Sequence, residues 1–184
     1  APGCDGVFNR SQVIVRESHR ARSLDDLRGA TVAFNDTDSQ SGYNALLAMV
    51  AALDGGNMFF GDRESTGSHQ DSVLAVRDGL ADVAAIDCVS LAGMLRHRPE
   101  VARGVRVLAQ SDPYPGLPLI TSIGTSASDL AALRAALCWA MQEASLADVR
   151  ADLLLSAFEP LERADYRACS QMRQRSVARG CSTL

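Results

Sequence analysis

Short apolar runs alternate along the chain with segments in which apolar residues recur every three or four positions. The runs predict strands at residues 13–15, 30–34, 58–60, 82–87 and 105–108. The segments with helical spacing lie at 24–29, 41–54, 68–77 and 88–96. Gly55-Gly56 and Gly79 are expected to end two of these helices, and Pro99 a third. Strands alternating with helices of this length predict an α/β fold, with a mostly parallel sheet covered by helices on both faces.

The chain changes character after residue 111. The segment 112–118 contains three prolines, so it is expected to be an extended connector, followed by a brief strand at 119–121. The later spacing predicts three helices and no strand, within residues 126–141, 146–158 and 163–179. Such helices must bury their apolar stripes, so we expect them to pack on the sheet. Cys138 lies in one of these stripes and is expected in the core.

Composition excludes several classes of function. The 184 residues carry 18 basic and 22 acidic side chains, and the net charge of −4 argues against nucleic-acid binding. All basic residues are Arg, so a Schiff-base or phosphate-loop lysine is excluded. The longest apolar run, residues 45–53, is far shorter than the roughly 18 residues of a membrane span. No signal-peptide pattern opens the sequence, so a signal was either removed or never present.

Metal binding is not expected. The five cysteines form no Cys-x-x-Cys pair, which disfavours a zinc site of the usual spacing and leaves their disulfide pairing open. A site made by Asp36, Asp38, His69 and Asp87 is disfavoured too, because carboxylates near helix N-termini are already compensated. We therefore expect neither a metal nor another cofactor.

Small polar side chains gather where three strands are followed by helices. They are Ser39, Ser41 and Gly42 at the first junction, Ser68 and His69 at the second, and Asp87 at the third. The carboxyl ends of parallel strands meet at one edge of a sheet, where helix N-termini offer free N–H donors. This pattern predicts an anion site.

Each of these residues also has a plainer interpretation, because Ser and Asp are common helix caps. Two serines exceed what one cap needs, and Gly42 in the first helical turn would let a ligand approach the backbone. His69 lies at a helix start, where the dipole disfavours its charged form unless an anion is near. Asp87 either caps the following helix or faces the ligand, and the residues leave both open.

Several motifs together resemble the phosphate/phosphonate-type solute-binding proteins of ABC transporters. The motifs are LRGATVAFND at 27–36, DSQSGYN at 38–44, GSH at 67–69, ADVAAIDC at 81–88 and PGLP at 115–118. They occur in the order and spacing of that family, and the resemblance extends from about residue 10 to about residue 166.

The resemblance implies a two-lobed periplasmic-binding-protein architecture joined by two crossing segments. Residues 29–110 would form one complete parallel-sheet lobe. Residues 1–28 and 111–184 would form an incomplete lobe with C-terminal helices, because relatives begin with a further βαβα portion that is absent here. Strand edges and apolar stripes left uncovered there would favour self-association, or indicate an upstream segment lost from the chain.

The resemblance also implies a function. The chain would be the solute-binding component of an ABC importer, would capture phosphate, phosphite or an organophosphonate, and would deliver it to the membrane permease from the periplasm or another extracytoplasmic space. Ser39, Gln40 and Ser41 would hold the phosphoryl oxygens, His69 would donate a hydrogen bond and Asp87 would face the ligand. The full set of expected ligand-binding residues is Ser39, Gln40, Ser41, Gly42, Tyr43, Ser68, His69 and Asp87.

Two alternatives stay open. One is a sensory or interaction module that keeps this fold without a ligand. The other is a small hydrolase, with Ser41 or Ser68 as nucleophile beside His69 and Asp71 or Asp87, or with a Cys88–His69 thiol pair. The nucleophile motif G-x-S-x-G is missing, which disfavours an enzyme.

Overall fold

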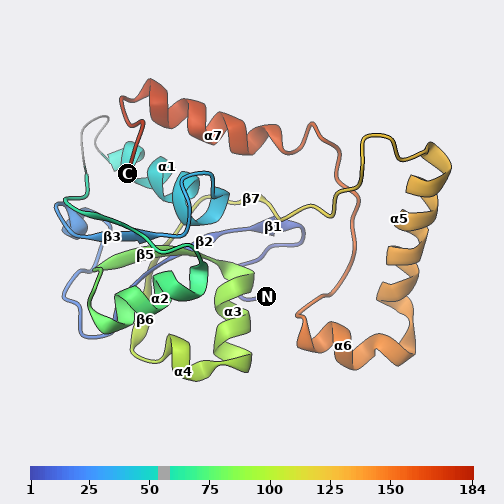
Figure 1. The fold of residues 1–184 in the computed structure, drawn as a ribbon, viewed down its shortest axis with the longest axis horizontal. Helices are drawn as coiled ribbons and strands as arrows, with labels where there is room; N and C mark the ends of the chain where they lie inside the picture. The colour runs from blue at the N-terminus through green and yellow to red at the C-terminus, as the bar shows by residue number, and fades with distance from the viewer. Residues whose placement is uncertain (54–58) are drawn as a thin grey trace.

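A five-stranded sheet forms the centre of the protein (Figure 1), seen in a computed structural model that describes residues 1–53 and 59–184. The strands in spatial order are β4 (Arg63–Ser65), β3 (Val32–Phe34), β5 (Val83–Asp87), β2 (Ser11–Arg16) and β6 (Val105–Gln110). β3 pairs in parallel with β4 and β5, whereas β2 pairs antiparallel with β5 and β6. Four of the five strands therefore run in one direction, and the predicted α/β fold with a mostly parallel sheet is confirmed.

The strand β2 belongs to this sheet although it precedes the segment 29–110 that we expected to form the complete lobe. Its residue Ile14 lies opposite Ala84 of β5 on one side and Val107 of β6 on the other. A Val-Ile-Val run suits a strand whose two faces are both covered. The sheet thus extends beyond the expected boundary at residue 29, because pairing with distant strands decides which segments share a sheet.

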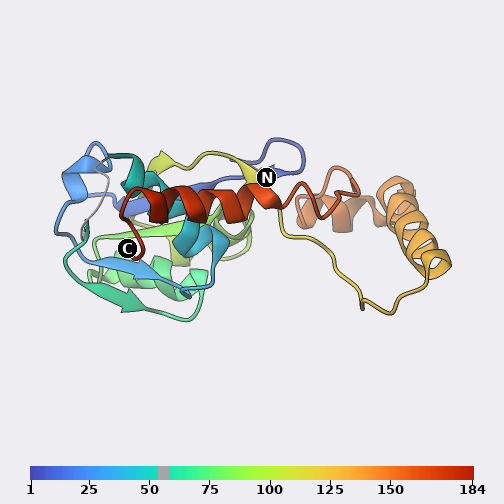
Figure 2. The same cartoon turned by 90° about the horizontal axis from the view of Figure 1, so that it is seen from above.

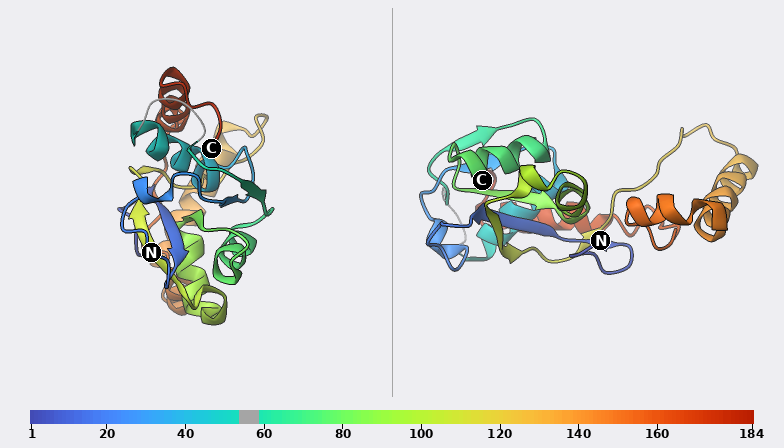
Figure 3. Two further views of the ribbon diagram at one scale, coloured as in Figure 1. Left: turned by 90° about the vertical axis from the view of Figure 1, so that its left-hand side faces the viewer. Right: turned by 90° about the horizontal axis from the view of Figure 1, so that it is seen from below.

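Helices cover both faces of the sheet (Figures 1 and 3). One face carries the π-helical turn η2 (Gln40–Asn44), which continues into α1 (Ala45–Leu53), and α7 (Arg167–Ala178), which packs on α1. The other face carries α2 (His69–Asp78), α3 (Cys88–His97) and α4 (Pro99–Ala102). Side chains alternate between the two cores: Val13 and Val15 join the first, and Ile14 joins the second.

Local signals located most of these elements. The 3₁₀ turn η1 (Asp25–Leu27) lies within the predicted segment 24–29. α2 begins after its cap Ser68 and ends at Gly79, whose φ of +82° is a conformation that glycine adopts without strain. Gly55-Gly56 lie outside the described residues, as does Met58.

The strand predicted at 58–60 is wrong for its described part. Phe59 and Phe60 are buried in a bend, with ring centroids 4.9 Å apart. The edge strand is instead the exposed, polar β4, which pairs with β3. An apolar run predicts that its residues are buried, but it does not show that they form a strand. An edge strand with exposed side chains can form without an apolar run.

A two-stranded antiparallel ribbon joins the sheet region to the rest of the chain. It pairs β1 (Phe8–Asn9) with β7 (Tyr114–Pro115), and β7 lies within the predicted extended connector. Beyond the ribbon lie α5 (Ala127–Gln142), η3 (Ala144–Leu146) and α6 (Ala147–Asp152), away from the sheet (Figure 2).

The expectation that all three C-terminal helices pack on the sheet is wrong for α5 and α6, neither of which has a buried residue. Cys138 is exposed rather than in the core, and Trp139 is 60% exposed. Residues 119–121 form no strand, and Ile120 is 88% exposed, because no strand lies beside them. Helical spacing marks an apolar stripe, but it does not supply the surface that would cover it.

The described residues contain no helix that is both long and apolar enough to cross a membrane.

Candidate functional site

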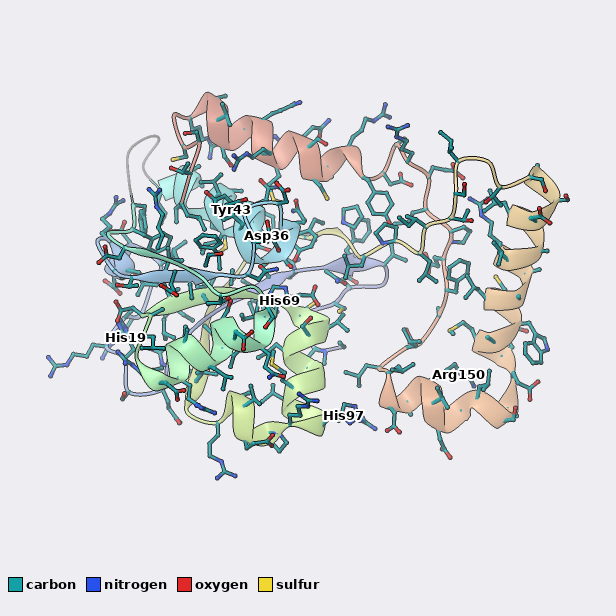
Figure 4. The ribbon with its side chains drawn as sticks, in the orientation of Figure 1. His19, Asp36, Tyr43, His69, His97 and Arg150 are labelled. Atoms are coloured by element: carbon teal, nitrogen blue, oxygen red, sulfur yellow. The ribbon has the colours of Figure 1, made fainter. Side chains whose placement is uncertain are left out.

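A cleft of about 530 Å³ opens at the edge of the sheet. Its walls come from the loop after β3, the start of α2, the end of β5, the β1–β7 ribbon and the start of α7. Asp36 and His69 are labelled at this end of the sheet in Figure 4. Of the eight expected ligand-binding residues, five line the cleft: Ser39, Gln40, Ser41, His69 and Asp87.

Ser41 and His69 join the first two junctions. The Oγ of Ser41 lies 2.9 Å from Nε2 of His69, and Nδ1 of the same ring is buried without a hydrogen-bond partner. Burial lowers the pKa of His69, and the nearby carboxylate of Asp87 opposes this only in part. The neutral ring therefore has one protonated nitrogen and one acceptor nitrogen, and Ser41 satisfies one of the two.

Ser39 and Gly42 build the first helical turn. The Oγ of Ser39 accepts a hydrogen bond of 2.9 Å from the N–H of Gly42 and so caps η2. A Cβ atom on Gly42 would lie 1.8 Å from Oδ1 of Asn35, so glycine is required there to admit the Asn35 side chain. Gly42 itself does not line the cleft. It acts through Asn35, which lines the cleft and whose Oδ1 is buried without a partner.

Tyr43 and Ser68 also lie outside the cleft lining. Tyr43 is buried in the core, edge-on to Phe34 at 5.2 Å between ring centroids, and its hydroxyl accepts a hydrogen bond from the N–H of Leu184. Ser68 caps α2 by accepting from the N–H of Asp71. Ser68 is therefore a helix cap, as the simpler of its two interpretations predicted.

Asp87 serves as a cap and also lines the cleft. Its Oδ1 accepts from the N–H groups of Val89 and Ser90, at 3.0 and 2.9 Å. Its Oδ2 accepts from Nδ2 of Asn9, at 3.1 Å. The carboxylate is thus held between the N-terminus of α3 and the ribbon strand β1, with its remaining lone pairs at the cleft wall.

Tyr114 links the ribbon to the first junction through Ser11. The Oγ of Ser11 lies 2.8 Å from the Tyr114 hydroxyl, and it lies the same distance from the backbone oxygen of Ser41. Burial raises the pKa of Tyr114 well above its usual range, so the phenol stays protonated. Gln40 connects the first junction to α7, because its Nε2 lies 3.4 Å from the sulfur of Met172.

Eleven further lining residues were not among the expected ligand-binding residues: Asn9, Asn35, Asp36, Asp38, Tyr114, Pro115, Gly116, Leu117, Pro118, Tyr166 and Cys169. Asn35, Asp36 and Asp38 follow a predicted strand, so their position did carry a signal. The others come from the ribbon, from the connector that follows it and from the α7 region, where no local pattern indicates a site. Within residues 1–53 and 59–184, no cluster of three or more His, Cys, Asp or Glu side chains is arranged to hold a metal ion.

Comparison with known proteins identifies the class. A family model described as "ABC transporter, phosphonate, periplasmic substrate-binding protein" matches residues 5–166. A search of curated proteins finds no match.

Three solved structures resemble the chain. A binding protein component of an ABC phosphonate transporter from Pseudomonas aeruginosa has 25% identity and a TM-score of 0.82, over 98% of this chain and 62% of that one. PhnD1 from Prochlorococcus marinus, in complex with methylphosphonate, has 15% identity and a TM-score of 0.72, over 91% and 66%. A Xanthomonas citri protein bound to ATP has 20% identity and a TM-score of 0.68, over 94% and 66%.

The fold is that of two-lobed periplasmic binding proteins. The chain belongs to the family of periplasmic substrate-binding proteins of phosphonate ABC transporters. It spans 62–66% of the length of these solved structures. Members of this family bind substrates and are not enzymes, so the hydrolase alternative is set aside.

Proposed function

We propose that this protein captures a small phosphorus oxyanion in the cleft and passes it to the membrane permease of an ABC importer. Phosphate, phosphite and organophosphonates form the ligand class. The contact between Ser41 and His69 carries the proposal, because it brings the N-termini of two helices, η2–α1 and α2, to one point of the cleft. Membership in the phosphonate family supports the same ligand chemistry.

The cleft lining combines neutral hydrogen-bond donors with the three carboxylates of Asp36, Asp38 and Asp87, so an anion would be held by hydrogen bonds and not by a cation. Among the described residues that line the cleft, none is Arg or Lys. Hydroxyl groups of Ser39 and Ser41, helix N–H groups and the ring of His69 would take the place of a cation. Three or four hydrogen bonds to a charged ligand, at about 1.5–3 kcal/mol each, supply about 5–12 kcal/mol before the cost of association. Micromolar affinity needs about 8 kcal/mol after that cost has been subtracted, so these hydrogen bonds alone fall short of it, and a second wall of the cleft would have to add further contacts.

Asp87 would select among anions. A phosphorus oxyanion that carries a proton, or an amino group on an organophosphonate, can donate a hydrogen bond to this carboxylate. Sulfate is fully deprotonated at neutral pH and has no donor to offer. We therefore expect the protein to prefer protonated or amino-bearing phosphorus ligands over sulfate.

The β1–β7 ribbon would be the hinge of the two-lobed architecture. Residues 29–110, extended by β2 and by α7, which packs on α1, would form one lobe, and residues 111–166 would belong to the other. Asn9 and Tyr114 on the ribbon line the cleft, so movement of the ribbon would change its width.

Self-association stays a prediction. Large apolar side chains are exposed in the region after residue 111, among them Ile120, Trp139 and Leu153. Exposed apolar patches of more than a few hundred Å² are rare on monomers. Sedimentation of the purified chain, with and without ligand, measures whether copies associate through this region.

Calorimetric titration tests the binding function. The ligands are phosphate, phosphite, methylphosphonate and 2-aminoethylphosphonate, with sulfate as the competing anion. We expect at least one phosphorus ligand to bind with a Kd below about 1 mM and sulfate to bind more weakly. A folded chain that binds no phosphorus oxyanion at millimolar concentration would instead support the ligand-free sensory or interaction module.

A further inference from the structure

Two cysteines that play no part in the binding proposal meet beside the cleft. The Sγ atoms of Cys4 and Cys88 lie 3.2 Å apart, although the residues are 84 positions apart in sequence. Cys88 is buried as the first residue of α3, and Cys4 is half-buried in the segment before β1. Among the five cysteines, all of which the structure describes, no second pair of sulfur atoms is in contact.

Close packing holds the N-terminal segment against the start of α3. Gly3 has a φ of +87°, and a Cβ atom on it would lie 3.0 Å from Cβ of Cys88 and 2.3 Å from Nε2 of Gln12. Glycine is therefore needed on both conformational and steric grounds. The N-terminal segment thus packs closely against the side chains of Gln12 and Cys88, which brings the Cys4 sulfur to that of Cys88.

Polar contacts add a second constraint. The thiol of Cys4 contacts Oδ1 of Asn9 at 3.6 Å, and Nδ2 of Asn9 donates to the carboxylate of Asp87, which directly precedes Cys88. The four side chains thus form a closed arrangement that joins the N-terminal segment and β1 to the start of α3. Two of its members, Asn9 and Asp87, line the cleft.

We propose that Cys4 and Cys88 form a disulfide that fastens the N-terminal segment to the start of α3 beside the cleft. A disulfide has an S–S length of about 2.05 Å, so the two sulfur atoms need to approach by a further ~1.2 Å. The family is periplasmic, and the periplasm is a compartment in which disulfides form and persist.

Bond formation requires an oxidant, which is a small-molecule or protein disulfide. The thiolate of Cys4, the more exposed of the two, attacks one sulfur of the oxidant, forms a mixed disulfide and releases one thiol. The thiolate of Cys88 then attacks the Cys4 sulfur, forms the Cys4–Cys88 bond and releases the second thiol. Two protein thiols are oxidised and one disulfide is reduced to two thiols. Burial raises the pKa of Cys88 to about 12, so the second displacement should accelerate as pH rises.

Thiol counting and peptide mapping test the bond. The full chain, purified under reducing conditions, is treated with oxidised glutathione at about pH 8, near the ordinary pKa of cysteine. We expect intact-mass analysis to show the loss of two hydrogen atoms, and denatured protein to contain three free thiols instead of five. A peptide that joins Cys4 to Cys88 should appear in the non-reduced digest.

Matched serine variants identify the cysteines involved. Cys4→Ser should abolish the mass loss, whereas Cys138→Ser, which changes an exposed cysteine on α5, should retain it. Cys4 is only half-buried, so its variant is expected to fold, and the test does not depend on changing the buried Cys88.

Thermal unfolding supplies an independent measurement. The cross-link closes a long loop, so reduction should lower the unfolding midpoint of the oxidised wild type by about 5–15 °C. The midpoint of Cys4→Ser should not respond to the reductant. Five free thiols after oxidation, a cross-link between other cysteines, or a mass loss that survives in Cys4→Ser would each overturn the proposal.

Discussion

The hydroxyl oxygen of Ser41 lies 2.9 Å from Nε2 of His69, although the two residues are 28 positions apart. Ser41 belongs to η2 and His69 opens α2, so the contact joins two helix N-termini on opposite faces of the sheet. Parallel strands bring such junctions to one edge, and the unpartnered Nδ1 of His69 lies buried there.

Removing the Ser41 hydroxyl should weaken ligand binding. Ser41→Ala deletes one hydrogen bond to a charged ligand, which costs about 1.5–3 kcal/mol, or roughly a 10- to 150-fold rise in Kd. Calorimetric titration with the tightest phosphorus ligand measures the change. An unchanged Kd would show that Ser41 is not a ligand group.

The matched control for this change is Ser126→Ala. Ser126 caps α5 by accepting from the N–H of Asp129, and it does not line the cleft. The same loss of a hydroxyl should leave the Kd unchanged while removing a cap interaction, a change of about 0.5–2 kcal/mol in helix or protein stability. If both variants bound equally weakly, the effect of Ser41→Ala could not be assigned to the site.

Acidification should destabilise the protein through His69. Burial lowers its pKa, so between the ordinary value of 6.5 and the lower folded value the unfolded chain binds a proton that the folded chain does not. The contribution of His69 to stability is complete above pH 6.5 and falls as pH decreases, with a limiting slope of about 1.4 kcal/mol per pH unit. Below the folded pKa the loss levels off.

Chemical denaturation from pH 8 down to about pH 5, in phosphate-free buffer, measures this slope. His69→Gln has no titrating ring at this position, so its unfolding free energy should fall less steeply than that of the wild type. His19 and His97 are present in both proteins and cancel in the comparison. Parallel curves for the two proteins would contradict a buried, neutral His69.

Gly42→Ala should destabilise the first junction. The added methyl group would lie 1.8 Å from Oδ1 of Asn35, so either the η2 turn or the Asn35 side chain must shift. We expect a loss of about 1–3 kcal/mol in unfolding free energy, together with weaker ligand binding. In an Asn35→Ala background the clash disappears, and the cost of Gly42→Ala should shrink.

Gly93→Ala is the matched control for that substitution. Gly93 lies within α3, and a Cβ atom there would meet nothing within 4 Å. Alanine is the better helix former by about 0.8–1.0 kcal/mol, so this variant should be more stable than the wild type. Urea unfolding that shows the same sign for both glycine variants would reject the steric explanation at Gly42.

Asp87→Asn should change ligand selectivity. The amide oxygen can still accept from Val89 and Ser90, so the cap of α3 is kept, but the new amide NH2 group cannot accept the hydrogen bond that Nδ2 of Asn9 donates, so the variant should also lose stability. Loss of the negative charge removes the repulsion of sulfate and the acceptor for a ligand proton. We expect the preference for phosphate over sulfate to fall at least about tenfold, or ~1.4 kcal/mol.

Competition titrations with phosphate and sulfate measure this preference. Asp129→Asn, in the first turn of α5, removes the same charge away from the cleft and should leave it unchanged. Equal affinity of the wild type for the two anions would already exclude a selective role for Asp87.

Most helix starts and the class of the fold follow from the sequence alone, whereas the strand predicted at 119–121 is absent from the structure. The helix starts at Ser39, Ser68 and Asp87 were predictable because a cap depends on residues within one turn of itself. The alternation of apolar runs with segments of helical spacing was sufficient to predict an α/β fold, because the apolar pattern of each element shows which of its side chains are buried. The motifs that resemble the family could also be recognised from the sequence, because they occur along the chain in the order of that family.

Which of these residues share a site depends on tertiary contacts. Tyr43 is buried in the core, and the hydroxyl of Ser68 is engaged in capping α2. Asn9 and Tyr114, in contrast, line the cleft from the ribbon. The position of β2 in the sheet could not be predicted from the sequence either. The same holds for the exposure of the apolar residues of α5 and α6.

The physical reason is the range of the interactions. Propensity, periodicity and capping act between residues within about four positions of one another, so they can be read along the chain. Strand pairing, burial and the contacts Ser41–His69, Asn9–Asp87 and Cys4–Cys88 join segments from 28 to 84 residues apart. Such contacts exist only once the sheet has brought the segments together.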